Sequence, residues 1–270
     1  MTKIILIFLF STSLLLGSNK ELRLGFLSVE NSEVIHNRLA PFAKYLENKT
    51  GRKVILETGH DYYDTIDKIT KEVFDIAYLG PVPFIKAKEI NPNLNIIASL
   101  QNNSKNSFKS VIIVKKDSNI KSLSDLKNKT FAFGSRDSTL SYYIPMYMLK
   151  KENIDKKLQR FDFLGRHDRV AQYVIMGKYD AGSVKNSIAE KYKNYIDIVE
   201  SSDNYENFLF VASPSLDKKL FTLIEDALLE LKDKSILRTF DSNCVGFSKK
   251  EDKDYNSLRE IVKIIDSFER

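Results

Sequence analysis

The sequence contains a single cysteine, Cys244, among 270 residues. One thiol cannot build a disulfide framework, a paired-thiol redox motif or a cysteine-rich zinc site, so these are excluded. Glycine and proline are scarce, at 10 and 6 residues, which excludes collagen and low-complexity disorder. Hydrophobic residues make up 43% of the chain. The composition therefore predicts a globular protein with one large domain or two lobes.

Clusters of like charge are missing as well. The chain carries 42 Lys and Arg against 36 Asp and Glu, a formal net charge of +6, but no run of five or six basic residues. Basic pairs such as Lys150-Lys151 stand between acidic residues, which is typical of a solvated surface and argues against nucleic-acid binding. A net positive field still favours a small anionic ligand.

Sequence motifs of common catalytic sites are also absent. The chain has no Gly-x-Ser-x-Gly elbow, no phosphate loop ending in Gly-Lys-Ser/Thr, no His-Glu-x-x-His motif and no dinucleotide fingerprint. His36, His60 and His167 fall in separate predicted elements without metal-ligand spacing. We therefore expect no cofactor, no metal ion and no enzymatic activity.

The N-terminus carries an apolar segment. Lys3 precedes an apolar run over residues 4–16, and Gly17 and Ser18 follow. The run is shorter than the about 20 residues that span a bilayer, so residues 1–18 are typical of a secretory signal peptide. An uncleaved anchor is the alternative, because a leucine occupies a cleavage-site position where a small residue is preferred. We expect an exported, periplasmic protein.

From residue 21 onward, short strand-like runs alternate with amphipathic segments of helical length, which is typical of α/β layers around a largely parallel sheet. Strands are predicted at residues 22–28, 54–56, 75–79, 111–114, 130–133, 161–164, 180–183, 196–199 and 208–211. Helices are predicted at residues 41–51, 63–73, 141–151, 170–176, 216–231 and 255–268. Residues 80 and 81, Gly-Pro, are predicted to form a turn.

The two sets of elements predict two lobes. The chain would cross between them near residues 106–110 and 201–207, forming a hinge. We assign residues 19–108 plus 206–270 to lobe 1 and residues 109–205 to lobe 2. Ligands of such sheets bind beyond the carboxyl ends of the strands, so the loops there should line a cleft between the lobes.

A hydroxyl-rich loop follows the strand predicted at residues 130–133 and leads into a helix. The first turn of a helix has unpaired amide hydrogens and partial positive charge, so this loop could hold an oxyanion, with Ser138 and Thr139 adding hydroxyl donors. The alternative is that one of them only caps the helix. Pro145 suits a helix that begins near Tyr142 and would kink one that begins at Thr139.

His167 lies on another loop predicted to face the cleft. Near an oxyanion its ring could donate an N–H bond, and the anion would raise its pKa; a structural histidine is the alternative. Tyr63, at the start of a predicted helix, and Tyr78, at the end of a strand, are candidate phenol donors that could equally belong to the core. Arg136 and Arg166 flank the same loops and could pair with the anion or remain solvated.

Together these segments resemble the periplasmic substrate-binding proteins of phosphate, phosphite and phosphonate ABC transporters. The resemblance extends from about residue 22 to the last predicted helix. It depends on segments in order at residues 24–28, 41–51, 74–81, 110–114 with 123–126, 138–145, and 167–177 followed by 180–181. It implies a type II periplasmic-binding-protein fold, in which two α/β lobes joined by two hinge strands close over a ligand like a Venus flytrap.

In that family a Ser-Thr-Ser loop at a helix start, a histidine and tyrosines from the other lobe bind the oxyanion. We add Tyr78 because it lies at the end of a predicted strand, where the cleft is expected. The predicted ligand-binding set is Ser138, Thr139, His167, Tyr63, Tyr78, Ser141 and Phe108. Two positions depart from the family pattern. Leu140 replaces the third loop residue, with Ser141 next, and Phe108 replaces a tyrosine, so its ring can stack but cannot donate.

Family members that take aminoalkyl phosphonates carry an acidic residue where this chain has Val-Lys-Asn-Ser at residues 184–187. The resemblance therefore favours phosphate, phosphite or another small phosphorus oxyanion, which a monomer would deliver to the membrane permease of an ABC importer. Two other classes stay open. One is a sensory protein that signals to a membrane kinase or chemoreceptor; the other is an enzyme on the same fold, against which the exported leader counts.

Overall fold

The computed structural model describes residues 21–103 and 108–267 of the chain. The predicted signal peptide, residues 1–18, lies outside the described residues. In the part that is described, no helix combines the length and the apolar character needed to cross a membrane.

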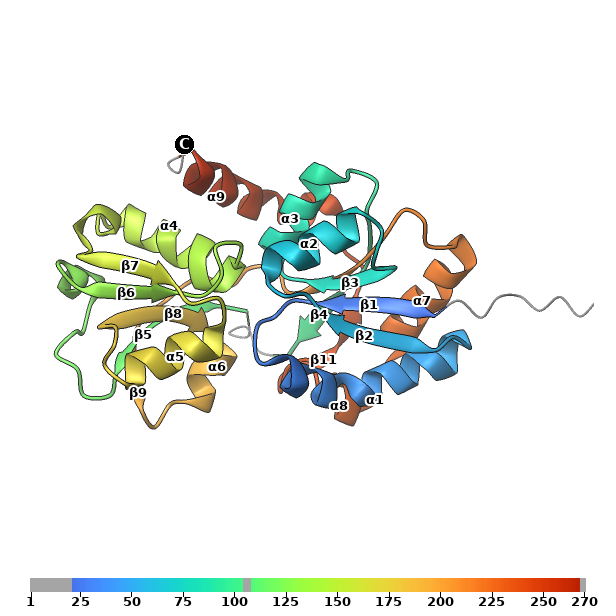
Figure 1. Cartoon of the computed structure of the whole chain (residues 1–270), viewed down its shortest axis with the longest axis horizontal. Helices are drawn as coiled ribbons and strands as arrows, with labels where there is room; N and C mark the ends of the chain where they lie inside the picture. Colours follow the sequence, from blue (N-terminus) through green and yellow to red (C-terminus); the bar gives the residue numbers. More distant parts are fainter. Residues whose placement is uncertain (1–20, 104–107, 268–270) are drawn as a thin grey trace, which may run out of the picture.

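Two β-sheets stand side by side and form the frame of the molecule (Figure 1). One sheet has six strands: β1 (Leu22–Phe26), β2 (Val54–Thr58), β3 (Ile76–Leu79), β4 (Asn95–Asn102), β10 (Leu209–Ala212) and β11 (Cys244–Ser248). The other has five: β5 (Ser110–Lys115), β6 (Thr130–Phe133), β7 (Arg160–Phe163), β8 (Ala181–Lys185) and β9 (Ile196–Ser201). Below, lobe 1 is the part built on the six-stranded sheet and lobe 2 the part built on the five-stranded sheet.

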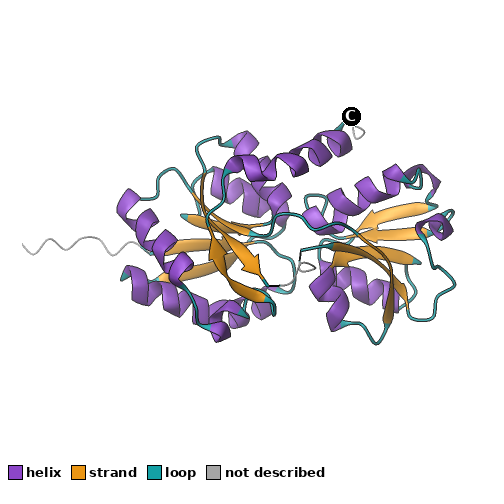
Figure 2. Ribbon diagram, turned by 180° about the vertical axis from the view of Figure 1, so that it is seen from behind, coloured by secondary structure: helices purple, strands orange, loops and turns teal. Residues whose placement is uncertain are grey.

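Helices pack on both faces of each sheet (Figure 2). Lobe 1 carries α1 (Ser32–Thr50), α2 (Tyr62–Thr70), α3 (Pro81–Ile90), α7 (Lys218–Glu230) and α8 (Lys234–Leu237), and lobe 2 carries α4 (Ile144–Lys151), α5 (His167–Ile175) and α6 (Asn186–Lys191). Successive side chains of a strand point to opposite faces. In β5, Val111 and Ile113 therefore face α5 while Ile112 and Val114 face the α4 side. The two-lobed α/β fold is confirmed.

Both sheets are mixed, so the expectation of largely parallel sheets needs a correction. Parallel pairs join β1 to β2 and β3, and β6 to β7 and β8. In contrast, β10 runs antiparallel to β3 and β4, and β5 runs antiparallel to β8 and β9. Each of these reversed strands is the first after a crossing between the lobes. The chain enters each sheet there from the cleft side, whereas the strands of the βα units point toward the cleft.

The turn predicted at Gly80-Pro81 is the start of helix α3. Gly80 is the N-cap residue and Pro81 opens the first turn, where the missing proline N–H costs nothing because that group has no partner inside a helix. The helix is buried on most sides, so its sequence lacks the one-sided apolar period that marks a surface helix. The sequence also failed to predict β4, β11, α6 and α8, and it placed the start of the first helix near Pro41, whereas α1 begins at Ser32 and has Pro41 inside it.

The last helix, α9 (Asn256–Asp266), lies beside both lobes (Figure 1). It packs against α3 of lobe 1 and against α4 of lobe 2, and the Tyr143 hydroxyl of lobe 2 donates to Asp266 Oδ1 at 2.6 Å. Its buried residues belong to an apolar cluster shared by the two lobes. The C-terminal helix is therefore a third connection between the lobes, besides the two crossings.

Candidate functional site

A cavity of ≈ 90 Å³ lies between the lobes, where β1, β3 and β8 end. Lobe 2 lines it with Ser138, Thr139, Leu140, His167, Lys185, Ser187 and Ile188. Lobe 1 contributes Tyr62, Tyr78, Gly80, Pro83, Glu30, Arg38 and several apolar residues, and the two crossing segments contribute Phe108 and Phe208. Of the predicted ligand-binding residues, the structure brings Ser138, Thr139, His167, Tyr78 and Phe108 to this cavity.

The hydroxyl-rich loop ends in a widened helical turn. Ser138 is its N-cap, with Oγ accepting from the Ser141 amide at 3.1 Å, and residues Thr139–Tyr143 form a π-helical turn that leads into α4. Pro145 lies in the first turn of α4 and has no amide hydrogen to give to Ser141. The Ser141 carbonyl instead accepts from Gly134 N and Ser183 Oγ. The widened turn thus accommodates the proline, and it begins at Ser138 and Thr139, which both line the cavity.

His167 is held as a neutral donor. Its Nδ1 accepts from the Lys185 amide at 3.0 Å, so the ring proton resides on Nε2, 3.2 Å from Ser138 Oγ. Burial lowers the pKa of His167 to about 4, with the Lys185 charge adding to this effect and the Glu30 charge opposing it. The imidazole is therefore uncharged at neutral pH and presents a fixed N–H.

The loop hydroxyls have their acceptor positions occupied. Ser138 Oγ accepts from the Ser141 amide and from His167 Nε2, and Thr139 Oγ1 accepts from the Val82 amide of α3 at 2.9 Å. Each hydroxyl keeps its own proton for another acceptor. Ser138 and Thr139 are 2% and 4% exposed, so this side of the cavity consists of buried hydrogen-bond donors.

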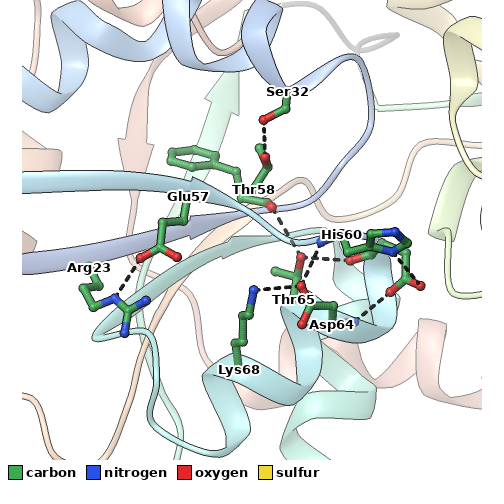
Figure 3. A network of polar contacts seen from close by, with 10 residues as sticks. Arg23, Ser32, Glu57, Thr58, His60, Asp64, Thr65 and Lys68 are labelled. Atoms are coloured by element: carbon green, nitrogen blue, oxygen red, sulfur yellow. Dashed lines mark hydrogen bonds and ion pairs between the residues drawn. The ribbon is translucent and has the colours of Figure 1, made fainter.

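The structure does not bring Tyr63 to the cavity: its side chain is 66% exposed, and Tyr62 lines the cavity instead. Asp61 caps α2 by accepting from the Asp64 amide, and Thr65 Oγ1 bonds to the Phe26 carbonyl of β1 (Figure 3). These bonds fix the rotation of α2 so that residues 62, 65, 66 and 69 face inward. Position 62 lies seven residues, about two helical turns, before the buried Ile69, so both residues lie on the same face of the helix. Helical periodicity in the sequence therefore pointed to Tyr62.

Tyr62 is 3% exposed. Burial raises the pKa of its phenol far above the ordinary value, and a hydrogen bond with Ser138 acts in the opposite direction. Tyr62 thus extends the chain of hydroxyl and imidazole groups from lobe 2 to lobe 1.

Ser141, included in the predicted ligand-binding set, does not line the cavity. Its Oγ accepts from the Gly134 amide at 2.7 Å and donates to the Ser183 carbonyl at 2.5 Å. A Cβ at Gly134 would lie 2.6 Å from that Oγ, so the glycine is needed for this close approach. Ser141 therefore anchors the loop to β8 and has no proton left for a ligand.

The two arginines near the loops point to other partners. The Arg136 guanidinium lies 4.3 Å from the centroid of the Phe163 ring, and Arg166 Nε donates to Asp168 at 3.1 Å. Neither residue lines the cavity.

Aromatic rings form the opposite side of the cavity. Tyr78 stacks on Phe208 with ring centroids 5.1 Å apart and lies 5.3 Å from Phe240 and 5.7 Å from Phe26. Phe108 meets Phe208 edge to face at 5.6 Å. Burial raises the pKa of Tyr78 well above its ordinary value, and no described residue hydrogen-bonds to its hydroxyl. We call these five rings the aromatic wall.

The charged residues of the described lining are all engaged in ion pairs. Glu30 Oε2 lies 2.6 Å from Arg38 Nη1, and Glu30 Oε1 lies 3.3 Å from Lys191 Nζ. Burial by itself would raise the pKa of Glu30, but the two cations together lower it. Lys185 pairs with Asp241 of lobe 1 at 2.8 Å. The cavity therefore offers an anion dipoles and hydrogen bonds more than a free cation.

Helix starts add to this potential. Tyr62 and His167 are the first residues of α2 and α5, and Gly80 caps α3. Each helix start places partial positive charge toward the cavity. Among the described residues, no group of three or more His, Cys, Asp and Glu side chains could hold a metal ion.

Sequence reasoning missed part of the lining. Besides Tyr62, it did not identify Glu30, Arg38, Phe208 and Phe240 as cavity residues. The rings of Phe208 and Phe240 reach the cavity from segments far from the loops in sequence, and no local pattern distinguishes them from core residues.

Comparison with known proteins identifies relatives over nearly the whole chain. Residues 24–255 match the family described as ABC transporter, phosphonate, periplasmic substrate-binding protein. A probable ABC transporter phosphite binding protein, PhnD1 of Prochlorococcus marinus (strain MIT 9301), is 27% identical over 281 residues, covering 95% of this chain and 93% of that protein.

Solved structures agree. PhnD1 of Prochlorococcus marinus in complex with methylphosphonate superposes with a TM-score of 0.83 at 27% identity, covering 92% of this chain and 99% of that one. A binding protein component of an ABC phosphonate transporter from Pseudomonas aeruginosa gives a TM-score of 0.82 at 22% identity, with 89% and 84% covered.

Proposed function

Since this chain belongs to the family of periplasmic substrate-binding proteins of phosphonate ABC transporters, we propose that it binds a small phosphorus oxyanion with one apolar substituent. The family gives it a solute-binding role in ABC import, with a membrane permease as its partner. Phosphite, with hydrogen on phosphorus, and methylphosphonate, with a methyl group, have the proposed chemistry. PhnD1, the relative described above, is named for phosphite and was solved with methylphosphonate.

The observation that carries the proposal is the contrast between buried donors and the aromatic wall. Ser138 and Thr139 have their acceptor positions occupied, Ser138 in part by the N–H of His167. Their hydroxyl protons, together with that of the Tyr62 phenol, are therefore offered to three oxygens of the anion. The fourth substituent then faces rings, which suits hydrogen or methyl. Phosphate would bury a fourth oxygen there without a partner, at a cost of about 1–3 kcal/mol.

The size of the cavity limits the substituent. One buried water molecule needs about 10–15 Å³ of cavity volume. The cavity volume of ≈ 90 Å³ therefore takes roughly six to nine water-sized groups. A tetrahedral anion with a short substituent fits this space.

The available donors can supply micromolar affinity. Such affinity needs about −8 kcal/mol, and a hydrogen bond to a charged group contributes about 1.5–3 kcal/mol. Tyr62, Ser138, Thr139 and the first amides of the π-helical turn together meet this requirement, even after the loss that lobe closure imposes.

The arrangement of Ser138 and His167 supports binding and not hydrolysis. A nucleophilic serine needs a histidine nitrogen that can accept its proton. Here Nδ1 accepts from the Lys185 amide, so Nε2 carries a proton and donates to Ser138. The pair therefore lacks the base that acyl transfer requires.

Calorimetry with a matched set of anions tests the ligand proposal. We expect phosphite or methylphosphonate to bind with a Kd at least about tenfold below that of phosphate, which corresponds to about 1.4 kcal/mol. Methanesulfonate, which has the shape of methylphosphonate but one charge less, is the control and should bind more weakly. Equal or tighter binding of phosphate would contradict the role of the aromatic wall. No response to any phosphorus anion at millimolar concentration would reject the ligand class.

We further propose that residues 1–18 direct export and are removed, and that the mature protein acts as a monomer. Family membership among periplasmic proteins supports the first point. N-terminal sequencing and size-exclusion chromatography of the periplasmic protein test both; an intact leader or a dimer would contradict them.

A further inference from the structure

The loop that carries the anion donors is docked onto helix α3 of the other lobe, outside the cavity. We propose that Lys86 and Asp137 determine ligand affinity through this docking although neither lines the cavity, and that Thr139 couples the docking to the anion. This inference rests on the proposed function in one respect: an anion must bind to the cavity so that its affinity can be measured.

Three contacts make up the docking. Lys86 Nζ of α3 lies 2.6 Å from Asp137 Oδ1 of the loop, and their side chains are only 24% and 18% exposed. The same ammonium lies 5.0 Å from the centroid of the Tyr143 ring in the π-helical turn. Next to them, Thr139 Oγ1 accepts from the Val82 amide at 2.9 Å. All three contacts join lobe 1 to lobe 2.

The start of α3 needs this partner. A helix leaves its first amides without intrahelical acceptors, and a side chain of the N-cap residue usually accepts from one of them. The N-cap of α3 is Gly80, which has no such side chain. Thr139 takes over this function from the opposite lobe, so α3 is capped only while the lobes are together.

Thr139 can report ligand binding through the same oxygen. Its Oγ1 accepts from lobe 1, and its proton remains for an anion in the cavity, which Thr139 lines. Hydrogen bonds in a chain polarise and strengthen one another. An anion that accepts from Thr139 would therefore strengthen the contact with Val82, and by linkage a stronger contact would raise affinity for the anion.

The decisive variants change Lys86 and Asp137 singly and together. We expect Lys86→Met and Asp137→Asn each to raise the Kd for methylphosphonate about threefold to tenfold, as expected for a half-buried ion pair. The double variant should bind about as weakly as either single variant, because both remove one interaction. The charge-swapped pair Lys86→Asp with Asp137→Lys should recover part of the affinity.

Lys150→Met is the matched control. Lys150 lies 3.1 Å from Asp155, their side chains are 16% and 13% exposed, and both residues belong to lobe 2. Neither residue takes part in the three docking contacts described above, so affinity should stay at the wild-type value. Unchanged affinity in Lys86→Met and Asp137→Asn, or an equal loss in Lys150→Met, would overturn the proposal.

Thr139 is tested by two conservative variants. Thr139→Ser keeps the hydroxyl and should retain most of the affinity, whereas Thr139→Val keeps the shape and should lose about tenfold from one bond to a charged group. In the Thr139→Val background, Lys86→Met should have a smaller effect than in the wild type. Purely additive effects would contradict the coupling.

Small-angle X-ray scattering separates this proposal from the ligand proposal. If the wild type bound no phosphorus anion, the proposed ligand would be wrong, but scattering without any added anion would still test the docking. Lys86→Met should then show a larger radius of gyration than the wild type and than Lys150→Met. Identical radii would overturn the docking role.

Discussion

The two sides of the cavity are built from opposite chemistry. Lobe 2 contributes hydroxyl, imidazole and helix-start amide groups, fixed by local hydrogen bonds around Ser138 and His167. Lobe 1 and the crossing segments contribute mainly the aromatic wall, fixed by ring packing around Tyr78 and Phe208. On the lobe 1 side, Tyr62 adds an uncharged polar donor, and Glu30 and Arg38 are paired with each other. The difference assigns recognition of the oxygens to lobe 2 and recognition of the remaining substituent to the wall.

The two sides also differ in how they carry charge. The lobe 2 donors are neutral, since burial and the Lys185 charge hold the pKa of His167 near 4. The charged groups of the lining, Glu30, Arg38 and Lys185, are neutralised in ion pairs. An anion would thus be held by dipoles, which avoids the desolvation of a free buried cation.

The largest expected effect is a loss of folding stability at low pH, caused by the buried His167 of lobe 2. The folded pKa of His167 lies below the unfolded value of 6.5, so the unfolded chain binds more protons between these values and stability falls as pH drops from 6.5 to about 4. The shift corresponds to about 3 kcal/mol. Denaturant unfolding at a series of pH values measures it. His167→Gln should flatten this part of the curve, whereas the exposed His60→Gln should not. An unchanged curve in His167→Gln would contradict the buried neutral imidazole.

Two neighbouring serines separate binding from anchoring within lobe 2. Ser138→Ala should weaken methylphosphonate binding by tenfold to about a hundredfold, from one lost bond to a charged group. Ser141→Ala should leave affinity within a few-fold but lower the unfolding free energy by about 1–3 kcal/mol, because two buried hydrogen bonds of its hydroxyl, from the Gly134 amide and to the Ser183 carbonyl, are lost. Calorimetry and denaturant unfolding of both variants measure the contrast. A stronger affinity loss in Ser141→Ala would reverse these roles.

Two adjacent tyrosines test whether the buried Tyr62 phenol of lobe 1 contributes to ligand binding. Tyr62→Phe removes a buried phenol beside Ser138 and should raise the Kd about fivefold to tenfold. Tyr63→Phe changes a solvated side chain and should leave the Kd unchanged. Calorimetry on both proteins decides, and a loss in Tyr63→Phe alone would restore the original prediction from the sequence.

The smallest effect is expected at the aromatic wall. The Tyr78 hydroxyl has no hydrogen-bond partner among the described residues, so Tyr78→Phe should change the Kd for methylphosphonate less than about twofold, which is under 0.5 kcal/mol. The wall is expected to act through its rings and not through the Tyr78 hydroxyl. A tenfold loss would show that Tyr78 donates to the anion, and the contrast between the two sides would break down.

Short sequence patterns were enough to predict much of the fold and part of the candidate site. Alternating apolar residues predicted strands in both lobes, and the hydroxyl-rich loop and His167 were placed at the ends of strands, where the structure has them. These features depend on residues within a few positions of one another. The resemblance to the family rests on the same short segments, and the family match over residues 24–255 confirms it.

Other features depend on contacts between distant segments. The reversal of β5 and β10 follows from the two crossings, and the rotation of α2 follows from the bond between Thr65 and the Phe26 carbonyl. Ser141 looks like a third loop hydroxyl in sequence, yet the carbonyl of Ser183 takes its proton.

The sequence by itself determined that this is an α/β protein whose strand ends carry hydroxyl, imidazole and phenol groups suited to an anion. Only the tertiary structure decided which of these groups meet in one cavity, that Tyr62 and not Tyr63 does so, and that an aromatic wall faces them. The physical reason is range: propensity and periodicity act over one or two helical turns, whereas the direction of a side chain at the cavity is set by partners tens of residues away.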